Sequence, residues 1–139
     1  MARELRSALP NHVIVDWDDF MPAAGALAGR DVRRSPDLWD AYRELVRSVI
    51  DILRSVPTVL LGVCTPDELR GWPEAQWILL DCEDDERRRR LAGRSEEEVD
   101  GALVDARQYR RLHLPVLDTS ARPVDEVARE LAALAVPGW

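Results

Sequence analysis

The apolar segments TVLLGV (58–63) and AQWILLD (75–81) do most to limit the fold that this chain can adopt. Both are short and lack strict alternation of polar and apolar residues, which is typical of strands buried on both faces of a parallel sheet. HVIV (12–15) and PVLD (115–118) are two further short runs of this kind. Because parallel strands need long crossover connections, segments with helical patterning should separate these runs.

Segments with helical spacing do lie before, between and after the strand-like runs. A long helix is expected to begin at Ser35, with Pro36 in its first turn, and to end before Pro57. Thr65 and Ser95 each stand three residues before a glutamate, and this capping-box spacing predicts two more helix starts. Other helices are expected over 2–9, over 84–92 and from Pro123 onward, whereas residues 21–34 are expected to form a loop.

The alternation of strands and helices predicts an α/β fold in which helices cover both faces of a parallel sheet. At 139 residues the chain is long enough for one core, and we expect a single domain over residues 1–139. Cys64 and Cys82 each lie at the end of an apolar run and are expected to be reduced core thiols. His12 and His113 have no ligand spacing with them, so no metal site is expected.

Charge and hydropathy exclude several classes of partner. The formal net charge of -7 argues against binding to nucleic acid or to anionic membrane surfaces, both of which need a basic face. No apolar run approaches the ~20 residues of a membrane span, and residues 1–20 lack the pattern of a secretory signal. These features favour a cytoplasmic protein with a small-molecule partner.

Carboxylates cluster directly after the first strand-like run, at Asp16, Asp18 and Asp19. Open α/β sheets bind their ligands at the carboxyl ends of the strands, which is where these residues are expected. Carboxylates there could hold magnesium through water or accept a proton from a substrate hydroxyl. The alternative is that one carboxylate caps a turn and the others are solvated. Trp17, between them, could pack on a substrate ring.

The run EDDERRRRLAGR (83–94) resembles a nucleic-acid patch, but helical geometry weakens that interpretation. Each of the four consecutive arginines has an acidic residue four positions earlier, so a solvated helix with paired charges is expected for Arg87, Arg88 and Arg89. Arg90 and Arg94 differ because they flank the expected end of this helix. Their guanidinium groups could close over phosphates.

A phosphate-binding loop is absent from the sequence. GALAGR (25–30) has the wrong glycine spacing and carries Arg30 where the phosphate loop carries lysine. All 19 basic residues are arginine, so a mechanism that requires lysine is excluded for this chain.

In the order of its landmarks, the chain resembles the small P-loop kinases, which are P-loop NTPases and include shikimate, gluconate and nucleoside monophosphate kinases and chloramphenicol phosphotransferase. MARELRSALP resembles the later part of the helix after the phosphate loop, and HVIVDWDDF resembles the strand that ends in an Asp-rich sequence. WILLDCEDDERRRRLAGR resembles the strand and Arg-rich lid, within a lid-like segment at about 84–112, and PVLDTSARPVDEV resembles the last strand, its loop and the following helix.

The resemblance implies an ATP- and Mg²⁺-dependent phosphotransferase that acts on a small hydroxylated molecule. It implies that Asp18, or alternatively Asp16, is the catalytic base or the partner of the substrate hydroxyl. The remaining implied site residues are Trp17 and Asp19 at the substrate and Arg90, Arg94 and Arg122 at the nucleotide.

In these kinases the phosphate-loop strand lies at the centre of the sheet, between the strands that correspond to 58–63 and 75–81. Its absence leads us to expect an incomplete domain, encoded with a start codon assigned too late, that does not bind ATP normally or hydrolyse it. The alternative hypothesis is a degenerate, non-catalytic binding or regulatory module of the same fold.

Overall fold

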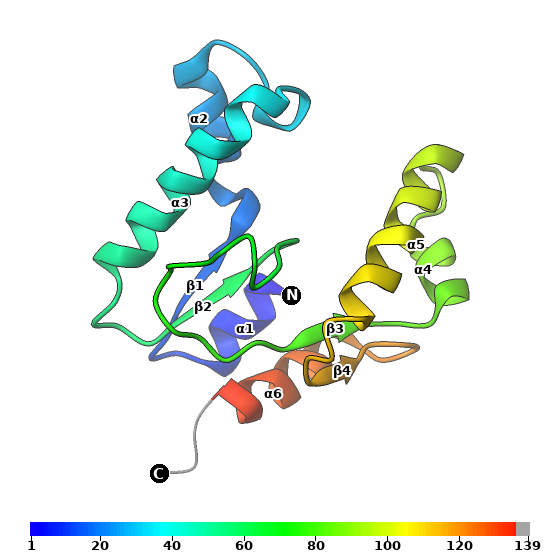
Figure 1. The fold of residues 1–139 in the computed structure, drawn as a ribbon. Helices are drawn as coiled ribbons and strands as arrows, with labels where there is room; N and C mark the ends of the chain where they lie inside the picture. The colour runs from blue at the N-terminus through cyan, green and yellow to red at the C-terminus, as the bar shows by residue number, and fades with distance from the viewer. Residues whose placement is uncertain (136–139) are drawn as a thin grey trace. The chain divides into compact units, whose positions relative to one another are not determined.

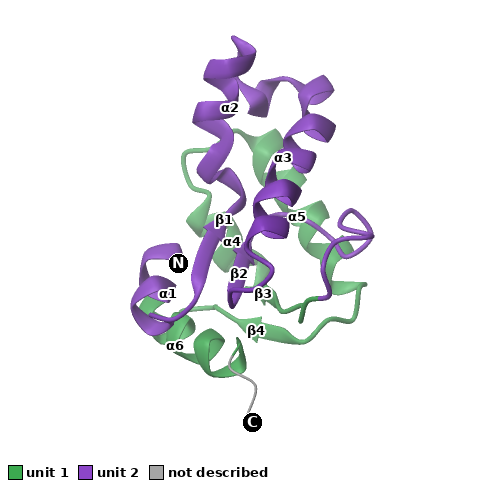
Figure 2. Ribbon diagram, turned by 90° about the vertical axis from the view of Figure 1, so that its left-hand side faces the viewer, with its two compact units in different colours: residues 1, 75–139 green, residues 2–74 purple. Residues whose placement is uncertain are grey.

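The computed structural model describes residues 1–135 and contains helices and short parallel strands (Figure 1). The chain divides into two compact units, which Figure 2 shows in different colours. We call residues 2–74 the N-terminal unit, and Met1 together with residues 75–139 the C-terminal unit. Each unit contains one pair of parallel strands.

In the N-terminal unit a parallel ladder joins β1 and β2, with Val13 opposite Thr58 at one end and Asp16 opposite Leu61 at the other. The α-helices α1 and α3 confirm the expected helices in outline. The elements are α1 (Ala2–Ala8), β1 (Val13–Asp16), the 3₁₀ helix η1 (Trp17–Phe20), α2 (Met21–Ala28), the 3₁₀ turns η2 (Val32–Arg34) and η3 (Pro36–Leu38), α3 (Trp39–Ile52) and β2 (Thr58–Leu61).

One core cluster of this unit forms where α3 packs on the helical segments η1, α2 and η2. Val46 is completely buried, and Tyr42 and Val32 are buried beside it. Apolar residues four apart on α3 share one face, which explains why this helix supplies two of the three central residues. Partly buried residues pack around them: Trp17, Phe20, Met21, Ala24, Leu38, Ile50, Leu60 and Trp72.

The expectation of a loop over residues 21–34 is wrong, because α2 occupies Met21–Ala28. Alanine, the best helix former, fills four of its eight positions, and Pro22 lies in the first turn, where its missing N–H costs nothing. The helix ends at Gly29, which has φ +74° and so adopts the left-handed conformation that glycine tolerates best. The glycines of this segment favour a loop, but its alanines form a helix, and Gly29 ends that helix.

The N-cap expected at Ser35 is confirmed only in part: Ser35 is the N-cap of the 3₁₀ turn η3, which leads into α3, but its side chain makes no cap hydrogen bond. The Ser35 hydroxyl donates to the carbonyl of Asp31 at 2.8 Å, and residues Pro36–Leu38 form a 3₁₀ turn before α3 begins at Trp39. Serine hydroxyls compete in this way for nearby carbonyls, so a serine before a proline does not by itself locate the start of a helix.

In the C-terminal unit β3 and β4 are parallel, with Leu79 opposite Val116. The Ser95 capping box is confirmed: its hydroxyl accepts from the Glu98 N–H at 3.2 Å, and the Glu98 carboxylate accepts from the Ser95 N–H at 2.9 Å. The elements are β3 (Leu79–Asp81), α4 (Asp84–Arg90), α5 (Glu96–Arg110), β4 (Val116–Asp118) and α6 (Val124–Ala135), and the buried apolar residues are Cys82, Leu103, Ala106, Leu117, Val127, Ala128, Leu131 and Ala132.

Two further expectations fit only in part. The strand expected over 75–81 forms only at Leu79–Asp81, since the ladder begins where the Leu79 N–H donates to the carbonyl of Pro115 at 2.8 Å. The capping-box bonds between Thr65 and Glu68 are present, but no α-helix follows them. Residues 66–71 form consecutive turns instead, and the last of these residues is Gly71, with φ +82°.

Parallel pairing of short strands in a mixed α/β chain is therefore confirmed. The strands form two separate two-stranded sheets, β1–β2 and β3–β4, rather than one sheet across the chain. Both cysteines are free, with Cys82 buried and Cys64 partly buried. No helix within residues 1–135 is long and apolar enough to cross a membrane.

Candidate functional site

The carboxylates after β1 hold the strand-to-helix turn together. Asp16 is the N-cap of η1, and its carboxylate accepts a hydrogen bond from the Asp18 N–H at 3.1 Å. The Asp19 carboxylate accepts from the Asp16 N–H at 3.1 Å and so completes a capping box. This is the capping alternative that the sequence left open, and it is met here by two of the three carboxylates.

Two of these carboxylates also form ion pairs at the surface. Asp18 contacts the Arg33 guanidinium at 3.0 Å, and this hydrogen bond with its charge raises the pKa of Arg33. Asp19 lies 3.5 Å from Arg6, whose guanidinium also donates to the carbonyl of Ile14. Asp18 keeps 57% of its side chain exposed and, unlike Asp16 and Asp19, its carboxylate takes no part in the capping box, so it is the carboxylate of this cluster that the backbone does not already use.

Trp17, the expected substrate platform, contacts other aromatic residues. Its indole stacks on Trp72, with ring centroids 6.1 Å apart, and meets Tyr42 edge to face at 5.9 Å. The Tyr42 hydroxyl donates to the Trp17 carbonyl. Burial of Tyr42 raises its pKa, although a backbone hydrogen bond and the charge of Arg33 both lower it. Gly62 lies so close that a Cβ there would be 2.8 Å from the Trp17 Cβ. Packing therefore fixes the segment that carries Asp16 and Asp18.

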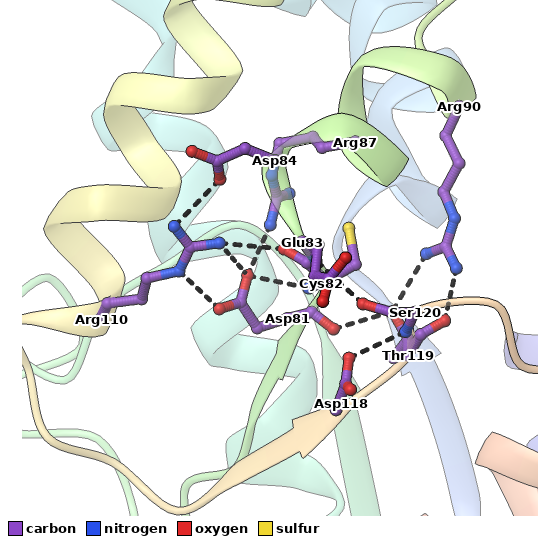
Figure 3. Close-up of polar contacts among 10 residues, drawn as sticks. All are labelled: Asp81, Cys82, Glu83, Asp84, Arg87, Arg90, Arg110, Asp118, Thr119 and Ser120. Carbon is purple, nitrogen blue, oxygen red and sulfur yellow. Dashed lines mark hydrogen bonds and ion pairs between the residues drawn. The ribbon is translucent and has the colours of Figure 1, made fainter.

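A second polar cluster lies at the carboxyl ends of β3 and β4, centred on Asp81 (Figure 3). The Asp81 carboxylate accepts from Arg110 at 2.6 and 3.1 Å, from Arg87 at 2.6 Å and from the Cys82 N–H at 2.9 Å. Only 15% of its side chain is exposed. Arg110 also contacts the Asp84 carboxylate and the Cys82 carbonyl, so its guanidinium joins β3 to the start of α4.

Burial, which favours the neutral acid, is the largest single influence on the pKa of Asp81. The hydrogen bonds from Arg110 and Cys82, together with the charges of Arg110 and Arg87, outweigh it, so the pKa of Asp81 is lowered. The hydrogen bonds that Arg110 donates to the carboxylates of Asp81 and Asp84 raise the pKa of Arg110. Asp81 and Arg110 are therefore both ionised at neutral pH. We had expected Arg87 to pair with Glu83, but the structure places it on Asp81 instead.

Arg90 and Arg122, two of the three arginines expected at a nucleotide, meet the same loop after β4. Arg90 donates to the Thr119 hydroxyl at 3.0 Å and to the Thr119 carbonyl (Figure 3), while its Nε pairs with Glu86 at 2.8 Å as expected. Arg122 donates to the Asp118 carbonyl at 3.0 Å and pairs with acidic residues of α6. Both therefore lie on the loop over residues 118–120.

Arg94, the third of these arginines, lies apart from that loop. Its guanidinium is 3.6 Å from Glu98 in the first turn of α5, and 66% of its side chain is exposed. The structure therefore brings together two of the three expected arginines.

The sequence patterns did not predict the cluster around Asp81 as a candidate functional site. A signal was present, because Asp81 ends the run WILLD just as Asp16 ends HVIVD. Its partner Arg110 lies 29 positions later, at the end of an amphipathic helix, and no local pattern joins the two.

The described residues do not fit the groups that the resemblance implies. No three histidine, cysteine or acidic side chains within residues 1–135 are grouped so that they could hold a metal ion. The sequence also has no glycine-rich loop with lysine to hold the β- and γ-phosphates of ATP. We therefore derive no chemical step through ATP or Mg²⁺ from this chain.

Comparison of the chain with known protein families, with curated proteins and with solved structures finds no match.

Proposed function

We propose that this chain has the architecture of the small P-loop kinases and contributes the substrate side of a cytoplasmic phosphotransferase for a small hydroxylated molecule. Asp18 is the proposed partner of the substrate hydroxyl, and Arg90 and Arg122 are the proposed contacts to nucleotide. The triphosphate-binding segment of such an enzyme is not in this sequence.

The observation that carries this proposal is the position of the break in strand pairing. β2 pairs with β1, β3 pairs with β4, and no ladder joins β2 to β3 in the described part of the chain. The resemblance places the phosphate-loop strand between the segments that form β2 and β3. Two parallel pairs, β1–β2 and β3–β4, with no ladder between β2 and β3 among the described residues, are compatible with a sheet in which a further strand stands between those two segments.

The distribution of polar groups gives further support. In each unit an aspartate ends a strand, Asp16 in the N-terminal unit and Asp81 and Asp118 in the C-terminal unit. The carboxyl ends of parallel strands are where α/β sheets place their ligand contacts. Asp18 is held on a turn that packing and a capping box make rigid. A carboxylate presented in this way can orient a hydroxyl group or accept its proton.

The test is calorimetric titration of MgATP into the 139-residue chain and into a version extended upstream in its own reading frame. We expect binding by the extended version alone. In that version Arg90→Gln and Arg122→Gln should each weaken ATP binding about tenfold or more, the loss of one charge-assisted contact. Arg129→Gln is the matched control, because Arg129 pairs with Asp125 on α6 and leaves 70% of its side chain exposed.

Asp18→Asn in the extended version should abolish phosphoryl transfer and leave ATP affinity unchanged. If neither version binds MgATP, the kinase proposal is wrong. If the extended version binds ATP but all three arginine variants behave alike, the assignment of Arg90 and Arg122 is wrong.

The alternative is a binding or regulatory module of the same architecture that has lost its chemistry. One observation favours it: Asp16 and Asp19 cap a turn, and Asp18 already has Arg33 as a partner. This alternative predicts a stop codon or unrelated sequence upstream, and no loss of function in Asp18→Asn.

A further inference from the structure

A surface pocket of about 390 Å³ lies in the N-terminal unit, against the second half of α3. This volume falls within the range of small-molecule sites. None of its lining residues belongs to the proposed kinase chemistry. They are Arg47, Asp51, Arg54, Gly71, Trp72 and Pro73.

Arg47 gives this pocket an incompletely satisfied cation. Its Nη2 donates to the Gly71 carbonyl at 3.2 Å, which ties the loop to the helix. The nearest carboxylate oxygens, on Glu44 and Asp51, are 3.9 and 4.0 Å away, beyond hydrogen-bond distance. A guanidinium has five N–H donors, so most of those of Arg47 are available to another acceptor.

Arg54 is a second cation at the same pocket. It donates to Asp51 at 2.8 Å, and 65% of its side chain is exposed, so the side chain can turn toward a ligand at little cost. Asp51 is the single acidic lining residue against these two arginines. The lining therefore carries a net positive charge on a protein whose overall charge is -7.

Trp72 supplies an aromatic wall. One face of its indole is fixed by the stack on Trp17, and Trp72 itself is only partly buried. A ring held in this way offers stacking and apolar contact with little loss of side-chain entropy on binding. Pro73 adds a rigid apolar residue next to it.

We propose that this pocket binds a small aromatic anion, that is, a planar ring bearing a carboxylate or phosphate. The guanidinium of Arg47 receives the anionic group, because its planar fork matches both oxyanions, and Trp72 contacts the ring. Trp72 stacks on Trp17, which lies between Asp16 and Asp18. A ligand that contacts Trp72 therefore also contacts, through this stack, the turn that carries those carboxylates.

The test is NMR titration of the full chain with benzoate and, separately, with phenyl phosphate. The indole N–H signal of Trp72 is assigned by its loss in Trp72→Phe. We expect both the Trp72 signal and the Arg47 Nε–H signal to shift, and the comparison of the two probes shows which oxyanion is preferred. Acetate and inorganic phosphate, which lack the ring, and phenol, which lacks the charge at neutral pH, should each bind at least about tenfold more weakly.

Arg47→Gln should weaken binding of the preferred probe about tenfold or more. Arg43→Gln is the matched control: it removes the same charge from the same helix, one turn earlier, and Arg43 pairs with Asp40 outside the pocket. The proposal is wrong if neither aromatic probe shifts the Trp72 signal at millimolar concentration, or if the two arginine variants weaken binding equally. Equal binding of acetate and benzoate would overturn the role of the ring. The kinase proposal does not depend on any of these results, because it makes no use of the pocket.

Discussion

We expect Asp81→Asn to destabilise the C-terminal unit more than any other single charge removal discussed here. The substitution preserves volume but removes the one negative charge shared by Arg87 and Arg110. It also turns amide donors toward two guanidinium groups. Arg110 would keep Asp84 as an acidic partner. Arg87 would lose Asp81, the carboxylate with which it pairs among the described residues.

The magnitude follows from burial. Removing one partner of a buried ion pair costs about 3–5 kcal/mol, because the other charge stays desolvated. Asp81 is 15% exposed, but Arg87 and Arg110 are 22% and 35% exposed, so solvent relieves part of the cost. We therefore expect a loss of about 3 kcal/mol in the free energy of unfolding, at the lower end of that range.

The assay is urea unfolding at pH 7, followed by the amide NMR signals of residues in β4 and α5. Following these signals matters because the two units need not unfold together. Asp85→Asn is the matched control: Asp85 lies in the first turn of α4, pairs with Arg88 at 3.2 Å and is 95% exposed. Its loss should cost about 0.5 kcal/mol or less.

The pH dependence of this effect has a definite sign. Because the pKa of Asp81 is lowered on folding, its contribution is complete above the unfolded pKa of about 4 and is lost as the pH falls through the lower, folded value. The difference between wild type and Asp81→Asn should therefore shrink below about pH 4. A loss under about 1 kcal/mol at pH 7, or equal losses in the two variants, would refute the reasoning.

Three other predictions concern packing, a helix cap and a thiol. Gly62→Ala should lower the melting temperature, because the new Cβ would lie 2.8 Å from that of Trp17. Gly101→Ala is the contrasting variant: a Cβ there meets no atom within 4 Å, and alanine in the interior of α5 should raise the free energy of unfolding by about 0.5–1 kcal/mol. Ser95→Ala should cost about 1 kcal/mol in urea unfolding by removing one half of a capping box, and an unchanged midpoint would contradict this. Burial raises the pKa of Cys64 to about 11. Alkylation of Cys64 by iodoacetamide, followed by mass spectrometry, should therefore be slow at pH 8 and become much faster toward pH 11, because the thiolate is the reactive form. Fast labelling at pH 8 would contradict this.

The sequence predicted well those elements whose signals are local. The capping box at Ser95, the amphipathic pattern of α3 and the apolar run of β2 each depend on residues within a few positions of one another. It failed where two local signals competed. In α2 the alanines and the glycines pointed to different structures, and the structure follows the alanines up to Gly29.

The candidate site was predicted in its composition but not in its contacts. A strand that ends in aspartates indicates a ligand-binding edge, and this placed Asp16, Asp18 and Asp19 correctly at the carboxyl end of β1. Which carboxylate caps and which faces solvent depends on hydrogen-bond geometry that a spacing pattern does not contain. The link between Asp81 and Arg110 depends on how α5 returns to β3, which is a tertiary contact.

The two-stranded ladders have a consequence for hydrogen exchange. In a parallel pair, alternate residues of a strand direct their N–H and C=O groups toward the partner. The Val13 N–H donates to Pro57 and the Leu79 N–H to Pro115, so Leu60 in β2 and Leu80 in β3 direct their backbone groups away from their ladders. Their amides should exchange quickly although each lies in the middle of a strand. Any strand added to either edge would slow these amides first, and their protection factors would report which edge had been taken.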